Sequence, residues 1–213
     1  MGIIKKGIMG GFSGKVGPVV GASWRGIDYI RAMPRKSEKP SSSKQLMQQG
    51  KMKLLRGFLL GVAEIIEDCF QNFEQKTPMN AALSYNLYHT TEGATPEEMV
   101  ISFPNLIYSK GDLLACWSLK VVCTASLTID FSWENSAFNP MCAGTDRAIV
   151  VVYDPVSKQF FRAVDAGVRQ ESSVKVIVPE DFKGHAVHCY ISFYSEEKSI
   201  ASTNQYLGSL DVL

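Results

Sequence analysis

The spacing of apolar residues changes near residue 99, and this change limits the possible folds more than any other feature of the chain. Before it, apolar residues recur every third or fourth position, as on one face of a helix. After it, apolar and polar residues alternate, most clearly over residues 127–133, as in a half-buried strand. The sequence therefore predicts an α+β protein with an N-terminal segment, residues 1–98, and a strand-rich domain, residues 99–213.

The chain is expected to begin with a β-hairpin. Strand-forming Val, Ile and Tyr residues separated by glycines predict two short strands within residues 10–31. The turn between them is expected at residues 24–26, where Gly26 can supply a positive φ. A polar connector bounded by prolines follows over residues 34–43.

Two helices are expected after this connector. The longer runs from about residue 44 to 74 and carries one continuous apolar stripe, and the shorter spans residues 79–89. Gly57 and Gly61 lie one turn apart in the longer helix. They either admit the close approach of another helix or strand, or are simply tolerated there.

The C-terminal domain is predicted to be an antiparallel β-sandwich, similar to immunoglobulin or fibronectin domains. Six or seven short strands separated by turn residues, over roughly 100 residues, are typical of that architecture. The predicted strands are residues 113–119, 127–133, 148–153, 159–163, 174–178, 186–194 and 205–213.

Charge is divided unequally along the chain. Residues 1–57 hold twelve cations and two anions, a net charge of +10, whereas residues 58–213 hold ten cations and nineteen anions, a net charge of −9. The basic segment could dock on an acidic surface of its own chain or of another copy. It could also bind nucleic acid, or simply be a solvated surface.

The best candidate for a contact surface is the hairpin itself, because it combines aromatic and cationic residues. Such residues are enriched at protein interfaces and also stack on nucleic-acid bases. The alternative is a hairpin that packs on its own helix. The candidate interaction residues are Lys15, Trp24, Arg25, Tyr29 and Arg31.

We find no catalytic, metal or cofactor pattern, and we expect a protein that is not an enzyme. The glycine-rich segment 10–16 resembles a phosphate loop, but it has three rather than four residues between Gly10 and Gly14. Val16 also stands where a magnesium-binding Ser or Thr is required. His185 and His188 are three residues apart, which on a strand directs them to opposite faces rather than to one metal ion.

The five cysteines are scattered, and no two form a C-x-x-C pair. We therefore expect neither a disulfide framework nor a thiolate zinc site. Four of them lie within apolar patterns, where a buried free thiol behaves as a small hydrophobic group: Cys69, Cys116, Cys123 and Cys189.

A cytoplasmic location without membrane contact is expected. The first residues lack the apolar core and cleavage site of a secretory signal, and no apolar run approaches the roughly 18 residues that span a bilayer. Lys6 stands where N-myristoylation requires Ser or Thr.

The N-terminal block resembles the opening of an uncharacterised protein family of Bacteroidetes bacteria. The resemblance is carried by the motif GGFSGKVGxVVG…WRGxxYxR within residues 10–31, and by residues 80–86, 145–148 and 206–210. Gly50 departs from it, because an arginine is expected at that position. The resemblance implies an architecture and no activity. The glycine–lysine hairpin is also similar, in a general way, to segments of phage-associated proteins.

Together these features predict a non-enzymatic interaction or assembly protein. Its basic hairpin and helix would contact a protein partner or a second copy of the chain. The alternatives are nucleic-acid binding through the same arm and a phage-related structural role. Carbohydrate binding on the sandwich rests on fold analogy alone. The sequence identifies no small-molecule ligand.

Overall fold

The computed structural model of the chain describes residues 2–3, 11–24, 26–34, 40–73, 75–93, 95 and 98–213. These residues form two compact units, Met1–Ser42 and Ser43–Leu213. The boundary differs from the predicted division into residues 1–98 and 99–213, because the helices belong to the same unit as the C-terminal strands. Each unit is described separately below.

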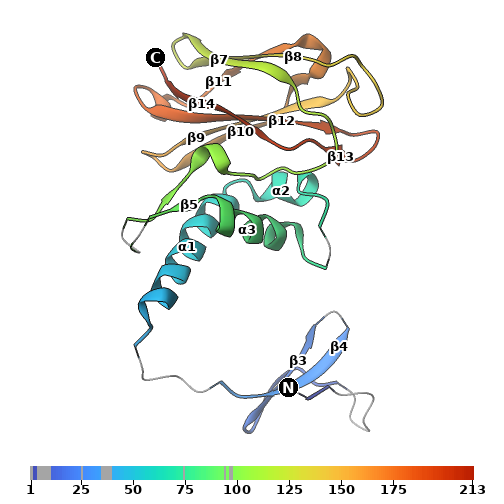
Figure 1. The fold of residues 1–213 in the computed structure, drawn as a ribbon, viewed down its shortest axis with the longest axis vertical. Helices are drawn as coiled ribbons and strands as arrows, with labels where there is room; N and C mark the ends of the chain where they lie inside the picture. Colours follow the sequence, from blue (N-terminus) through green and yellow to red (C-terminus); the bar gives the residue numbers. More distant parts are fainter. Residues whose placement is uncertain are drawn as a thin grey trace. The chain divides into compact units, whose positions relative to one another are not determined.

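The N-terminal unit is a four-stranded antiparallel sheet with the order β1-β4-β3-β2 (Figure 1). Its strands are β1 (Gly2–Ile3), β2 (Gly14–Val16), β3 (Val19–Trp24) and β4 (Ile27–Ala32). The predicted hairpin is confirmed: Trp24 pairs with Ile27 across the turn, and Gly26 has a φ of +76°. The additional strands β1 and β2 extend the hairpin into a sheet.

The second unit begins with three helices, α1 (Ser43–Leu60), α2 (Ala63–Cys69) and α3 (Pro78–His89). The single helix predicted over residues 44–74 is wrong, because it is interrupted between α1 and α2. There the Gly61 amide donates to the Phe58 carbonyl and the Val62 amide to the Leu59 carbonyl, so the last turn of α1 tightens to i−3 bonding. The predicted second helix agrees with α3, which packs on both α1 and α2.

Gly61 marks the interruption because the ring of Phe160 packs directly against it. A Cβ on Gly61 would lie within 3.0 Å of three Phe160 ring carbons, whereas a Cβ on Gly57 would meet nothing within 4 Å. Close approach therefore explains Gly61, and Gly57 is tolerated.

We expect Gly61→Ala to lower the free energy of unfolding by about 1–3 kcal/mol, because the added methyl group displaces Phe160. Gly57→Ala is the matched control and should raise the free energy of unfolding by up to about 1 kcal/mol, because alanine favours the helix. Urea denaturation of both variants measures the two effects. Equal changes of the same sign would contradict this interpretation of the interruption.

Two antiparallel sheets follow the helices in the second unit. The larger has the order β10-β9-β12-β13, with β14 pairing to the same edge of β12 as β13, and the smaller has the order β11-β8-β7. The strands of the larger sheet are β9 (Arg147–Asp154), β10 (Gln159–Val168), β12 (Ala186–Ser195), β13 (Ile200–Ala201) and β14 (Gln205–Asp211). Those of the smaller are β7 (Trp117–Ala125), β8 (Thr128–Glu134) and β11 (Ser173–Ile177). A separate two-stranded ladder joins β5 (Thr91–Glu92) and β6 (Val100–Ile101).

One hydrophobic core lies between the two sheets. Ile129, Phe131 and Trp133 face it from β8, as the predicted alternation requires. The first predicted strand, residues 113–119, is displaced, because β7 begins only at Trp117. Residues 113–116 instead bond to the segment around β13 and β14: the Leu113 amide donates to the Ala201 carbonyl and the Cys116 amide to Gln205 Oε1.

A second core lies on the opposite face of the larger sheet, where the helices cover it (Figure 1). Phe58 and Leu59 of α1 share this core with Ile149 and Val151 of β9 and Tyr190 of β12. The larger sheet is therefore buried on both faces, which explains the uninterrupted apolar run in β9. Helices and strands form one unit because this core joins them.

No helix in the described part of the chain is both long and apolar enough to cross a membrane.

Candidate functional site

The N-terminal sheet places four of the five predicted contact residues on one face. Directly paired residues of neighbouring strands share a face. The rows on this face are Lys15–Val20–Arg31, Ala22–Tyr29 and Trp24–Ile27. We call it the aromatic–cation face and define it by Lys15, Trp24, Tyr29 and Arg31. The fifth predicted residue, Arg25, lies outside the described residues.

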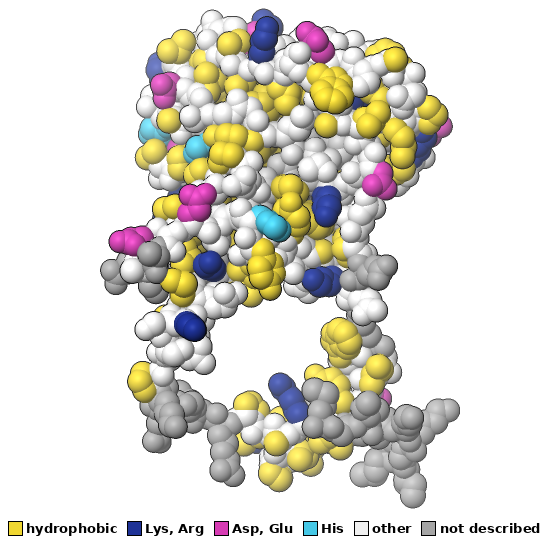
Figure 2. Space-filling view, in the orientation of Figure 1, with side chains coloured by type: hydrophobic (Ala, Val, Ile, Leu, Met, Phe, Trp, Pro, Cys, Tyr) yellow, Lys and Arg dark blue, Asp and Glu magenta, His cyan; other side chains and the backbone are white. Residues whose placement is uncertain are grey.

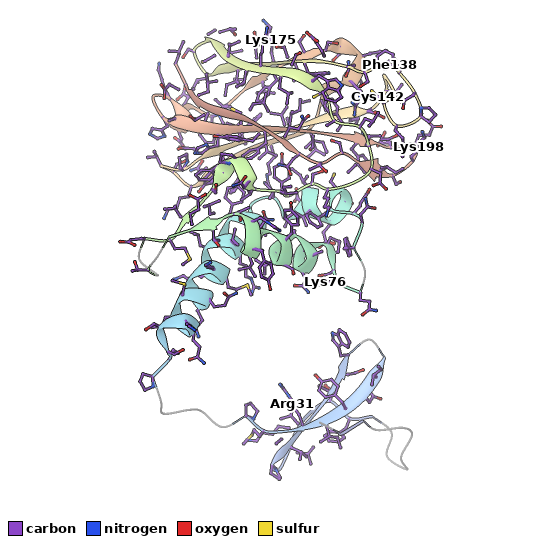
Figure 3. The ribbon with its side chains drawn as sticks, in the orientation of Figure 1. Arg31, Lys76, Phe138, Cys142, Lys175 and Lys198 are labelled. Carbon is purple, nitrogen blue, oxygen red and sulfur yellow. The ribbon has the colours of Figure 1, made fainter. Side chains whose placement is uncertain are left out.

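The aromatic–cation face is open to solvent. Trp24 is 61% exposed and Ile27 is 49% exposed. Lys15 and Arg31 are exposed and Tyr29 is half-buried. Figure 2 shows hydrophobic and cationic side chains at the surface of this unit, and Figure 3 labels Arg31 on β4. Sequence reasoning missed Ile27, although its alternation with Tyr29 and Arg31 along one strand was the signal that places it there.

Residues 11–12, which precede β2, cover part of the opposite face of the sheet. Gly21 points to that face, and a Cβ there would lie 2.6 Å from two ring carbons of Phe12. A Cβ on Gly11 would likewise collide with the carboxylate of Asp28. The glycines thus let residues 11–12 lie flat against the sheet. Lys15 lies in strand β2, not at the helix N-terminus that a phosphate loop requires.

The N-terminal unit has little core of its own. Of its described side chains, no hydrophobic one is buried, and Gly21 is the buried residue among those described. Small sheets normally need a hydrophobic face packed against another element to be stable. The open aromatic–cation face is therefore a candidate protein interface.

The second unit contains a histidine–carboxylate pair that resembles part of a catalytic triad. His185 Nδ1 lies 2.8 Å from Oδ2 of the buried Asp154. The Ser157 hydroxyl donates to the same oxygen at 2.6 Å, so it is not positioned by the histidine as a nucleophile would be. The Val156 amide donates to Asp154 Oδ1 at 2.8 Å. The carboxylate therefore organises the turn between β9 and β10.

The hydrogen bonds of this turn set the protonation of Asp154. Burial alone would raise the pKa of its carboxyl group. Hydrogen bonds from Ser157, His185 and the Val156 amide favour the ionised form, and together they hold the pKa below its usual value of 3.8.

His188, which lies in β12, has different partners from His185. His188 Nδ1 lies 2.9 Å from the Tyr206 hydroxyl, and the Phe103 ring stacks on the imidazole with 3.8 Å between centroids. Burial lowers the pKa of His188. The two histidines thus do not converge on one site, and the described residues contain no group of three or more potential metal ligands.

The cysteines lie mainly in the cores. Cys69, Cys116 and Cys189 are buried as predicted, whereas Cys123 is only half-buried. Burial raises the pKa of the Cys69, Cys116 and Cys189 thiols to about 12, so these three thiols stay protonated at neutral pH. A protonated, enclosed thiol is a poor nucleophile.

Comparison with known proteins identifies a family and no activity. The model of a family described as "Family of unknown function (DUF6266)" matches residues 11–208. The match begins just before β2 and ends within β14, so it includes the aromatic–cation face. A search of the curated proteins finds no match. The bacterial source and the N-terminal motif inferred from the sequence stay predictions.

Proposed function

We propose that the chain, which belongs to this family of unknown function, is a non-enzymatic interaction or assembly protein. It would make protein–protein contacts through its aromatic–cation face. The observation that carries the proposal is the shared face of Lys15, Trp24, Tyr29 and Arg31 on a sheet that has little core of its own. Covering this face with a partner would remove exposed apolar area from water.

The chemistry of the face suits a protein partner. Tryptophan, tyrosine and arginine are the residues that most often carry binding energy at the centre of an interface. A partner that covers Trp24 also excludes water from its cationic neighbours and so strengthens their ion pairs. The helical part of the original prediction is less favoured, because Leu55, Phe58 and Leu59 of α1 are buried within their own unit.

The immunoglobulin- or fibronectin-like architecture of the second unit is also part of this proposal. Its smaller sheet has the strand order β7-β8-β11, matching strands A, B and E of such sandwiches. The order β10-β9-β12-β14 matches C′, C, F and G. Domains of this architecture often serve as interaction modules, which is an argument by analogy.

Partner capture tests the proposed function. The chain of 213 residues is immobilised and exposed to a lysate of the organism that makes it, alongside the double variant Trp24→Ser/Arg31→Ser. The control is Val16→Ser, which changes a residue that is 58% exposed on the opposite face. We expect the double variant to retain at least tenfold less of each captured protein than the parent and the control do. Equal retention by all three proteins would overturn the proposal.

The second candidate function is nucleic-acid binding, favoured by the same juxtaposition of aromatic rings and cations. It predicts an affinity for single-stranded DNA or RNA that falls steeply as salt is raised. A filter-binding titration at about 50 mM salt distinguishes the two functions. Each phosphate contact makes the affinity for nucleic acid higher at low salt, so a nucleic-acid-binding protein would be detected there. Retention that Trp24→Ser/Arg31→Ser abolishes would favour this second function.

A further inference from the structure

The second unit carries a groove whose chemistry complements the aromatic–cation face. It lies between α2 and the larger sheet and has a volume of about 430 Å³. Three carboxylates and several apolar groups line it, and we call it the acidic groove: Glu64, Ile65, Asp68, Cys69, Arg147, Ile149, Val164, Tyr194 and Glu196. The apolar lining includes Val164, which is 46% exposed.

The carboxylates of the acidic groove outnumber its cations. Glu196 pairs with Arg147, and Arg162 Nη1 approaches Glu64 Oε2 from outside at 3.9 Å. Asp68 has no ion-pair partner among the described residues. The groove therefore combines an apolar floor with uncompensated negative charge.

We propose that the acidic groove receives the aromatic–cation face of a second copy of the chain. This inference rests on the proposed function and names its partner. Arg31 and Lys15 would lie near the carboxylates of the groove, while Trp24 would cover its apolar lining. Each side supplies what the other lacks: cations beside the exposed Trp24 on the face, and carboxylates beside the exposed Val164 in the groove.

The charges of the two units support this assignment. Residues 1–42 hold eight cations and two anions, a net charge of +6. Residues 43–213 hold fourteen cations and nineteen anions, a net charge of −5. Opposite net charges accelerate association between copies and favour this orientation over contact between like units.

Charge also selects this groove over the larger hollow beside α1. That hollow, about 470 Å³, has an aromatic floor formed by Phe58, Tyr153 and Phe160. Its charged lining residues are Lys53 and Lys158. A cationic sheet would be repelled there, because desolvating like charges together is unfavourable.

The connection between the units favours docking on a second copy over docking on the same chain. Ten residues separate the end of β4 at Ala32 from the start of α1 at Ser43, and they can span at most about 35 Å. The acidic groove lies at α2, beyond the whole of α1, whose 18 residues are about 27 Å long. Docking within one chain would therefore use most of the reach of the connector, whereas docking on a second copy does not tie the face to the length of α1. Reciprocal exchange of sheets between two copies instead closes a dimer in which both faces and both grooves are occupied.

Paired charge reversals in the chain of residues 1–213 test the proposal. Arg31→Glu reverses the face, and Asp68→Lys reverses the groove; both positions are exposed, so neither change disturbs a core. We expect the parent at about 50 mM salt to have twice the chain mass of 23.5 kDa by light scattering, and to dissociate at about 1 M salt. Each single variant should raise the dissociation constant at least tenfold.

Mixing the two variants provides the decisive measurement. In a mixed dimer the new carboxylate of the Arg31→Glu copy meets the new ammonium group of the Asp68→Lys copy. The second contact keeps its original charges, so the dimer mass should return. The exposed Asp181, outside the groove, serves as the control, and Asp181→Lys should leave the dissociation constant unchanged. A monomeric parent at about 100 μM, or a mixture that stays monomeric, would overturn the proposal.

The outcome separates this inference from the proposed function. If the parent is monomeric but Trp24→Ser/Arg31→Ser still loses captured proteins, the proposed function stands and the second copy is the wrong partner. If neither dimer nor capture depends on the face, both proposals fail.

Discussion

Asp146→Ala is expected to lower the free energy of unfolding by about 3–5 kcal/mol, because it leaves the buried charge of Arg169 without a counter-ion. Both side chains are almost fully enclosed, at 1% and 0% exposure, and Arg169 Nε lies 3.0 Å from Asp146 Oδ2. Equilibrium denaturation in urea at neutral pH measures this loss.

Arg169 joins several elements of the second unit, which is why its charge cannot move into water when its partner is removed. Nη2 donates to the Leu114 carbonyl at 2.8 Å, and the guanidinium lies 4.0 Å from the centre of the Phe193 ring. Its own carbonyl accepts a hydrogen bond from the indole of Trp133 at 3.1 Å. The residue thus links the smaller sheet, the larger sheet and the segment that precedes β7.

Two controls separate the buried charge from general damage. Lys175→Ala changes an exposed lysine, labelled in Figure 3, and removes its ion pair with the half-buried Asp130; it should cost less than about 1 kcal/mol. The double variant Asp146→Leu/Arg169→Met removes both buried charges and should recover most of the loss. A double variant no more stable than Asp146→Ala would show that the stability comes from the hydrogen bonds that these two side chains make to other residues, and not from their charges.

This ion pair also shows what the sequence could not reveal. Arg169, Gln170 and Glu171 are three consecutive polar residues, and nothing in their spacing indicates that Arg169 is buried. Its burial follows from contacts with residues distant in sequence, Leu114 and Phe193. Most of the strands were predictable, because a strand with one buried face and one exposed face alternates apolar and polar residues. That the helices and the larger sheet form one unit was not predictable. The apolar run in β9 indicates that both faces of this strand are buried, but it does not indicate which element covers them.

The candidate site was predictable to a similar depth. Residue types alone made the hairpin the candidate contact surface, and alternation along its strands could assign Trp24, Tyr29 and Arg31 to one face. The acidic groove was out of reach, because Glu196 lies more than a hundred residues after Glu64 and Asp68 in the chain. Docking on an acidic surface was one of the alternatives that the division of charge left open, and the fold determines where the carboxylates gather.

Asp154→Ala is the second large perturbation, with an expected loss of about 2–4 kcal/mol at pH 7. The variant leaves the amides of Val156 and Ser157 without their acceptor and removes the partner of His185. The turn between β9 and β10 would then lose the carboxylate that organises it. Asp165→Ala, an exposed aspartate on β10, is the matched control and should change stability by less than about 0.5 kcal/mol.

The pH dependence of this loss identifies its physical origin. The pKa of Asp154 is lower in the folded chain than its usual value of 3.8, so the unfolded chain binds the proton more readily. The contribution of the ionised carboxylate is therefore complete above about pH 4 and disappears as the pH falls through the lower folded value. The difference in stability between the parent and Asp154→Ala should accordingly narrow when urea denaturation is repeated from pH 7 down to pH 3. A stability difference between the parent and Asp154→Ala that stays constant over this pH range would mean that Asp154 acts through packing. The hydrogen bonds of the turn favour the ionised carboxylate, so a contribution from them must decrease as Asp154 is protonated.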